Sequence, residues 1–129
     1  MDSFSYHAYV PFNRLKQDIE FLAAHSVQPE IRLAAEDLDS LKMKDVEKLA
    51  REIPASLHVT VHAPYRDLSP GAFDRRVRTA TRERLEELLE VAEVLKARSV
   101  VCHLGYEPKQ HHRHTEEWLQ NSVETWSHL

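Results

Sequence analysis

The sequence predicts an α/β fold of the (β/α)-barrel type, in which about four strand-then-helix units build one parallel sheet. Two stretches carry the prediction: residues 57–62, LHVTVH, and residues 99–103, SVVCH. Both are short, rich in β-branched residues, and end on a histidine that precedes a loop. A long amphipathic segment separates them. Strands that alternate with helices favour parallel pairing through right-handed crossovers.

The first two units occupy the N-terminal part of the chain. We expect a strand at residues 6–10 that Pro11 ends, and a helix at 14–25 with Asn13 as its N-cap. The second strand is expected at 30–33. An acidic loop should follow at 34–44, and then a helix at 45–53 that stops at Pro54.

The last two units contain the clearest helix. The third strand, 57–62, leads into a long loop at 63–74, and a helix is predicted over 75–97 with a buried stripe made of Val77, Leu85, Leu88, Ala92 and Leu95. The fourth strand, 99–103, is followed by a polar loop at 107–113. Thr115 is the expected cap of a final helix that reaches Ser127, with an inner face of Trp118, Leu119, Val123 and Trp126.

Strand parity brings the two histidines together. Side chains alternate between the faces of a strand, so His62 shares a polar face with His58 and Thr60, while the opposite face is apolar. His103 occupies the matching position of the next strand. Active sites of (β/α) barrels lie at the carboxyl ends of their strands, so a metal or catalytic site is predicted there. A purely structural hydrogen bond for each histidine stays an open alternative.

Other polar residues near these strands are candidates with two readings each. Glu30 is either an inward carboxylate at a substrate pocket or a charge near a strand start, and His7 is either an inward ligand contact or a core or surface histidine. Tyr65 and Arg66 directly follow His62 and are placed for substrate contact, and Arg66 suits a phosphate or carboxylate. The HHRH tract at 111–114 can bind metal, but a solvated loop is the favoured interpretation.

Composition narrows the class of protein. The 129 residues fit one domain spanning 1–129, and the net charge of -4 with no basic run disfavours nucleic acid, although a local patch can hide in a neutral total. A single cysteine, Cys102, excludes an internal disulfide and suits a reducing compartment. The sequence shows no signal peptide and no transmembrane segment, so a cytoplasmic location is expected, with no membrane partner.

The segment HAPYRDLSPGAFDRRVR, the long helix after it and then SVVCHLGY resemble the third and fourth units of the xylose isomerase-like TIM-barrel superfamily. That group contains sugar and sugar-phosphate isomerases and epimerases, and the endonuclease IV type of DNA-repair enzyme. The resemblance implies a divalent metal (Mn, Zn or Mg) with His62 and His103 as ligands. From their positions next to these strands, we expect Glu30 as a catalytic carboxylate and His7, Tyr65 and Arg66 as substrate contacts. Such barrels need eight units, so the chain is expected to be the N-terminal half.

Three functions follow as expectations from the resemblance. The first is a metal-dependent isomerase or epimerase that acts on a small sugar or sugar phosphate. The second is zinc-dependent cleavage of DNA at abasic sites. The third is a non-catalytic half-barrel that assembles with the remaining half or with a second copy. This chain alone is expected to be inactive, because the late carboxylate ligands and the base would come from the other half.

Overall fold

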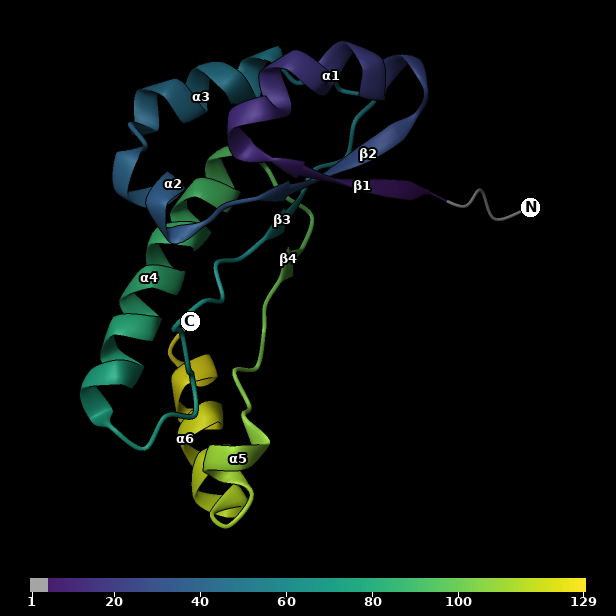
Figure 1. Ribbon diagram of the computed structural model, residues 1–129. Coiled ribbons are helices and arrows are strands. Elements are labelled where there is room, and N and C mark those ends of the chain that lie inside the picture. The colour runs from purple at the N-terminus through teal and green to yellow at the C-terminus, as the bar shows by residue number, and fades with distance from the viewer. Residues whose placement is uncertain (1–4) are drawn as a thin grey trace.

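The computed structural model describes residues 5–129, which form a four-stranded parallel sheet with helices on one face (Figure 1). The strands are β1 (Tyr6–Pro11), β2 (Val27–Arg32), β3 (Thr60–His62) and β4 (Val100–Val101), and their spatial order is β1-β2-β3-β4. Each strand pairs with the next one in the sequence, and all three pairs are parallel. The predicted α/β class and the four β-then-α units are confirmed.

Helices connect the strands and cover one side of the sheet. They are η1 (Phe12–Arg14), α1 (Leu15–Ala24), α2 (Ala35–Ser40), α3 (Met43–Glu52), α4 (Arg75–Val94), α5 (Pro108–His111) and α6 (Thr115–Ser127). In Figure 1, α1, α3 and α4 lie on the same side of the strands, and the other side of the sheet is bare. This one-sided cover is what a segment of barrel wall requires.

The core lies between the sheet and these helices. Ile31 and Val61 are fully buried, and Leu15, Val46 and Leu88 from the helices are buried with them. Their strand neighbours Glu30, Thr60 and His62 point to the bare face and stay partly exposed. The predicted alternation is therefore confirmed, because burial changes at every residue where β2 and β3 pair.

Two segments that the sequence predicted as loops contain short helices. The acidic stretch after β2 forms α2, where Asp37 Oδ2 accepts a hydrogen bond from the Ala34 backbone N–H at 2.7 Å. The polar stretch after β4 forms α5, where the Glu107 carboxylate accepts from the Lys109 backbone N–H and Pro108 occupies the first turn. Helices of six and four residues are too short to show an apolar period, so the sequence pattern does not reveal them.

Both predicted N-caps are wrong. Asn13 lies inside the 3₁₀ turn η1 and α1 begins two residues later, while Thr115 is already the first residue of α6. Neither helix has a side-chain cap.

The predicted inner faces of α4 and α6 need correction. Val77 is 38% exposed, and Leu119 and Val123 are more than half exposed. In α6 the buried positions are Trp118, Ser122 and Thr125, because Thr125 Oγ1 donates to the Pro70 carbonyl at 2.7 Å and turns the helix towards the loop before α4. Within the described residues, no helix is both long and apolar enough to cross a bilayer.

Candidate functional site

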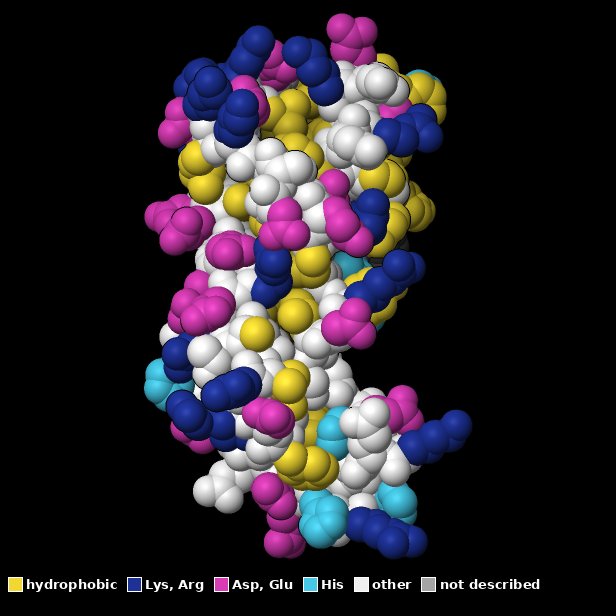
Figure 2. Space-filling model, turned by 60° about the vertical axis from the view of Figure 1, so that its left-hand side comes forward, with side chains coloured by type: hydrophobic (Ala, Val, Ile, Leu, Met, Phe, Trp, Pro, Cys, Tyr) yellow, Lys and Arg dark blue, Asp and Glu magenta, His cyan; other side chains and the backbone are white. Residues whose placement is uncertain are grey.

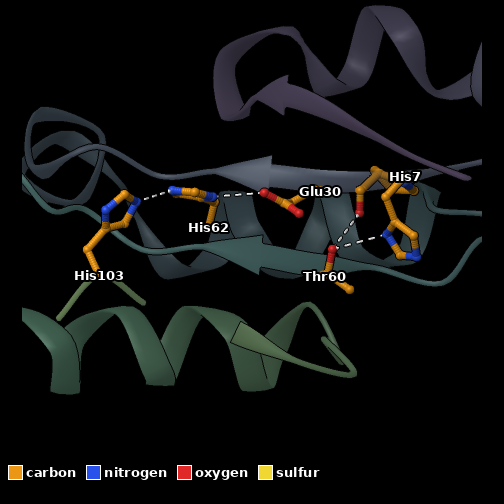
Figure 3. Close-up of polar contacts among 6 residues, drawn as sticks. His7, Glu30, Thr60, His62 and His103 are labelled. Atoms are coloured by element: carbon orange, nitrogen blue, oxygen red, sulfur yellow. Dashed lines mark hydrogen bonds and ion pairs between the residues drawn. The ribbon is translucent and has the colours of Figure 1, made fainter. Parts of the chain in front are cut away.

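His62 is the centre of a polar cluster on the bare face of the sheet (Figure 3). Its Nδ1 lies 2.8 Å from Glu30 Oε1, and its Nε2 lies 3.0 Å from His103 Nε2. Parallel pairing produces this arrangement: Glu30 is opposite Thr60, and His62 is two residues further along β3 on the same face. His62 is opposite Val101, and His103 is again two residues further along that chain. The predicted meeting of the two imidazoles is confirmed by the geometry.

The contact with Glu30 fixes the proton arrangement of His62. A carboxylate only accepts, so His62 Nδ1–H donates to Glu30, and the Nε2 atom faces His103. The side chains of His62 and Glu30 are 15% and 26% exposed, so water screens this pair only in part. Glu30 thus orients the imidazole ring.

Two tyrosines hold the rings in place. The Tyr65 ring stacks on His103 with centroids 4.3 Å apart and planes 20° apart. Tyr9, from β1, meets His62 edge-on with centroids 5.4 Å apart. Aromatic contacts of this geometry are favourable beyond their buried area, so they restrict rotation of both imidazoles.

A hollow of about 700 Å³ adjoins the imidazole pair at the carboxyl ends of β1, β2 and β3. Tyr9 and Tyr65 line it as well as touching the imidazoles. Two arginines, Arg32 and Arg66, line it too, and so do three acidic residues: Glu36 and Asp37 at the start of α2, and Asp67 in the loop after β3. The volume suits a small polar molecule, and guanidinium groups are the side chains best suited to bind carboxylate or phosphate.

A divalent metal fits the imidazole pair as two of its ligands. Two nitrogens that share one tetrahedral zinc at about 2.0–2.1 Å lie about 3.3 Å apart, close to the observed 3.0 Å between His62 Nε2 and His103 Nε2. The Glu30 carboxylate on the far nitrogen is the usual support of a metal-bound histidine. Residues 5–129 contain no group of three or more His, Cys, Asp or Glu side chains that could hold an ion. Further ligands would have to come from elsewhere.

The predicted substrate contacts differ in how they are placed. Tyr65 and Arg66 line the hollow, whereas His7 does not. His7 is opposite Gln28, further back along the sheet, and its Nδ1 lies 3.2 Å from Thr60 Oγ1. A substrate role for His7 therefore stays a prediction that the hollow does not support.

The sequence interpretation did not single out Tyr9 and Arg32, although a signal was present. Each lies two positions after a predicted site residue and so on the same face of its strand: Tyr9 follows His7, and Arg32 follows Glu30. Extending the alternation to the end of each strand would have found them.

The HHRH tract is only partly a solvated loop. His111 is buried at the end of α5, where its Nδ1 accepts a hydrogen bond from the Glu107 backbone N–H at 2.8 Å and its ring contacts Trp118. His112 and His114 are exposed, as expected. The loop interpretation is wrong for His111 because this ring fills an aromatic cluster with Phe73, Tyr106 and Trp118.

Known proteins similar to this chain share its architecture. A family model described as "Xylose isomerase-like TIM barrel" matches residues 17–129. An uncharacterized protein of Methanocaldococcus jannaschii, MJ1311, is 36% identical over 73 residues, which are 57% of this chain and 25% of that protein.

Solved structures extend the comparison over almost the whole chain. A D-tagatose 3-epimerase-like protein superposes with a TM-score of 0.72 and 26% identity, over 97% of this chain and 47% of its own. A D-psicose 3-epimerase determined in the presence of D-fructose gives 0.72, with 16% identity over 95% of this chain and 46% of its own. A Thermus thermophilus protein soaked with ZnCl₂ gives 0.75, with 21% identity over 95% and 50%. The chain spans about half the length of these structures.

Proposed function

The chain belongs to the xylose isomerase-like TIM-barrel family, and we propose that it forms part of a metal-dependent isomerase or epimerase for a small sugar or sugar phosphate. The observation that carries the proposal is the chain of contacts from Glu30 through His62 to His103. None of these three residues lines the hollow, but Tyr9 and Tyr65, which contact the imidazoles, do. Two structural neighbours, a D-tagatose 3-epimerase-like protein and a D-psicose 3-epimerase, support the reaction class.

His62 and His103 would hold the ion through their Nε2 atoms. Imidazole ligands favour zinc, whereas manganese and magnesium prefer oxygen ligands. A divalent ion held there would supply polarisation of a substrate carbonyl or hydroxyl. Binding requires that His103 Nε2 carry no proton, so its remaining proton would sit on Nδ1, while Glu30 already keeps His62 in the ligating form.

The other residues of the site would bind and orient the sugar. Arg32 and Arg66 would donate to a phosphate or to hydroxyl oxygens at the far side of the hollow. Tyr65 would keep His103 aligned by stacking, and Tyr9 would do the same for His62. The sequence predicts Glu30 as a catalytic residue, and its contact with His62 favours a positioning role for it.

Metal titration tests the assignment. Isothermal titration with Zn²⁺ and with Mn²⁺ should show that His62→Ala and His103→Ala each weaken binding by about tenfold or more, since loss of a mere supporting residue costs about 10–100-fold. His112→Ala removes an exposed histidine outside the cluster and serves as the matched control. Unchanged affinity in both site variants would remove the ligand assignment.

Four strands make half of an eight-stranded barrel. We propose that the remaining strands come from the rest of a longer chain or from a second copy of this one. Sedimentation separates these cases, and a dimer with no bound metal and no turnover would favour a purely assembling half-barrel. Metal analysis of the complete barrel separates the reactions, since three zinc ions per chain would favour DNA cleavage at abasic sites.

A further inference from the structure

A second hollow lies between α4 and α6, on elements that take no part in the imidazole site. Its volume is about 220 Å³. Three arginines of α4 line it with a threonine of the same helix, two residues of α6 and the residue directly after α6; the full set is Arg75, Arg78, Thr79, Arg82, Glu124, Thr125 and His128. None of these residues lines the first hollow. Figure 2 shows Lys and Arg side chains gathered near a His side chain over the lower half of the molecule, where both helices lie.

The helix itself makes this concentration of positive charge unfavourable. Arg75, Arg78 and Arg82 are spaced by three and four residues, which places them on one stripe of α4 where like charges repel. Arg75 and Arg78 also lie in the first turn, at the positive end of the helix dipole, where the carboxylate of the N-cap residue Asp74 accepts a hydrogen bond from the Arg76 backbone N–H. A bound anion would relieve both costs.

The arginines of the hollow lack the partners that another arginine of the same helix has. Arg84 Nη1 lies 2.8 Å from Asp39 and 2.9 Å from Glu87. Within residues 5–129, neither Arg75 nor Arg78 forms an ion pair. Arg82 approaches Glu86 only at 3.5 Å through its Nε, and that buried Nε makes no hydrogen bond among the described residues. Glu124 is the carboxylate that lines the hollow opposite these groups.

Hydrogen bonds hold the walls of the hollow in place. Arg78 Nη1 donates to the carbonyls of Ala72 at 2.6 Å and Phe73 at 3.0 Å, which leaves its other N–H groups for a ligand. Thr125 Oγ1 ties α6 to the same loop through the Pro70 carbonyl. His128 Nδ1 donates to the Glu124 carbonyl at 2.7 Å, so only its Nε2 is left for a ligand.

We propose that this hollow binds a phosphate group, either inorganic phosphate or the terminal phosphate of a small phosphomonoester. Phosphate offers several acceptor oxygens in a tetrahedral arrangement, and converging guanidinium forks are the protein groups that match it. A water molecule occupies about 30 Å³ of liquid, so the hollow has room for one phosphate, its first waters and a short ester substituent.

Titration of the chain with inorganic phosphate, followed by NMR chemical shifts, tests the proposal. We expect saturable shifts at residues 75–82 and 124–128, and affinities about tenfold weaker in Arg75→Gln and Arg82→Gln, because each removes a charge-assisted hydrogen bond. Arg76→Gln is the matched control. It removes the same charge from the same turn, but Arg76 is exposed and does not line the hollow.

The outcomes are distinct. Equal weakening by Arg76→Gln would show unspecific attraction and overturn the proposal, and so would shifts that do not saturate. A parallel titration with methyl phosphate distinguishes the two sources: tighter binding than inorganic phosphate assigns the hollow to an ester, and weaker binding assigns it to the free anion. Zinc affinity should be the same in all three arginine variants, since the imidazole pair is on the sheet.

Discussion

Glu30→Gln is the sharpest test of the imidazole pair, because it removes a charge and keeps the shape of the side chain. Glu30 Oε1 lies 2.8 Å from His62 Nδ1, so glutamine can still accept this hydrogen bond through its own oxygen. A hydrogen bond to a neutral acceptor is about half as strong as one to a charged acceptor. Loss of such a support costs about 10–100-fold in metal affinity, and the partial exposure of both side chains places this substitution near tenfold, or about 1.4 kcal/mol.

The assay is Zn²⁺ titration by calorimetry, supported by ¹⁵N NMR of the His62 ring without metal. We expect weaker zinc binding and a less uniform Nδ1–H tautomer in Glu30→Gln. Glu36→Gln is the matched control, because Glu36 lines the neighbouring hollow and is exposed, with no contact to His62. If both variants lose affinity equally, the effect is general electrostatics and the positioning role of Glu30 is refuted.

Three further predictions concern stability and reactivity. Gly71→Ala should lower the Tm, because the added Cβ would overlap the Trp118 indole ring. Such overpacking costs about 1–3 kcal/mol of stability. An unchanged Tm would mean that the indole moves aside freely. Leu88→Ala should cost about 2–5 kcal/mol in urea unfolding, since Leu88 is fully buried; a loss under about 1 kcal/mol would contradict the core position. Burial raises the pKa of the Cys102 thiol. A disulfide reagent should therefore modify this thiol more slowly in the native chain than in urea at the same pH. Equal rates would contradict this.

The same thiol makes stability depend on pH. The folded chain holds the Cys102 proton more tightly than the unfolded chain does, because its pKa is raised on folding. Its contribution is therefore complete below the unfolded pKa and is lost as the pH rises through the folded pKa. Cys102→Ser should flatten the alkaline end of a stability profile, and an unchanged slope would argue against this linkage.

The sequence predicts the sheet and the imidazole pair because both depend on the alternation of side chains between the two faces of a strand. Alternation in β3 and in the stretch around β4 places His62 and His103 on one face, and parallel pairing places them at one edge. The contact between Glu30 and His62 was not predictable in the same way. It depends on the register of β2 against β3, which non-local packing sets and no local pattern encodes.

Helix ends and inner faces were less predictable, for a related reason. Leu119 and Val123 follow a helical apolar pattern, yet α6 turns Ser122 and Thr125 inward, because a hydroxyl bond to Pro70 and the fit of Trp118 against Gly71 decide its rotation. These contacts join residues about fifty positions apart. The apolar pattern of a helix is a weak guide to which side faces inward where such tertiary contacts compete with it.

The two outer strands of the sheet are unequal, which gives any completing partner a direction of approach. The outer edge of β1 is six residues long, Tyr6–Pro11, whereas that of β4 is two residues long, Val100–Val101. A longer run of unsatisfied main-chain donors and acceptors can capture an incoming strand earlier and fix its alignment. If further strands complete a cylinder, β1 would give them the longer edge for pairing, and β4 the shorter one, beside His103.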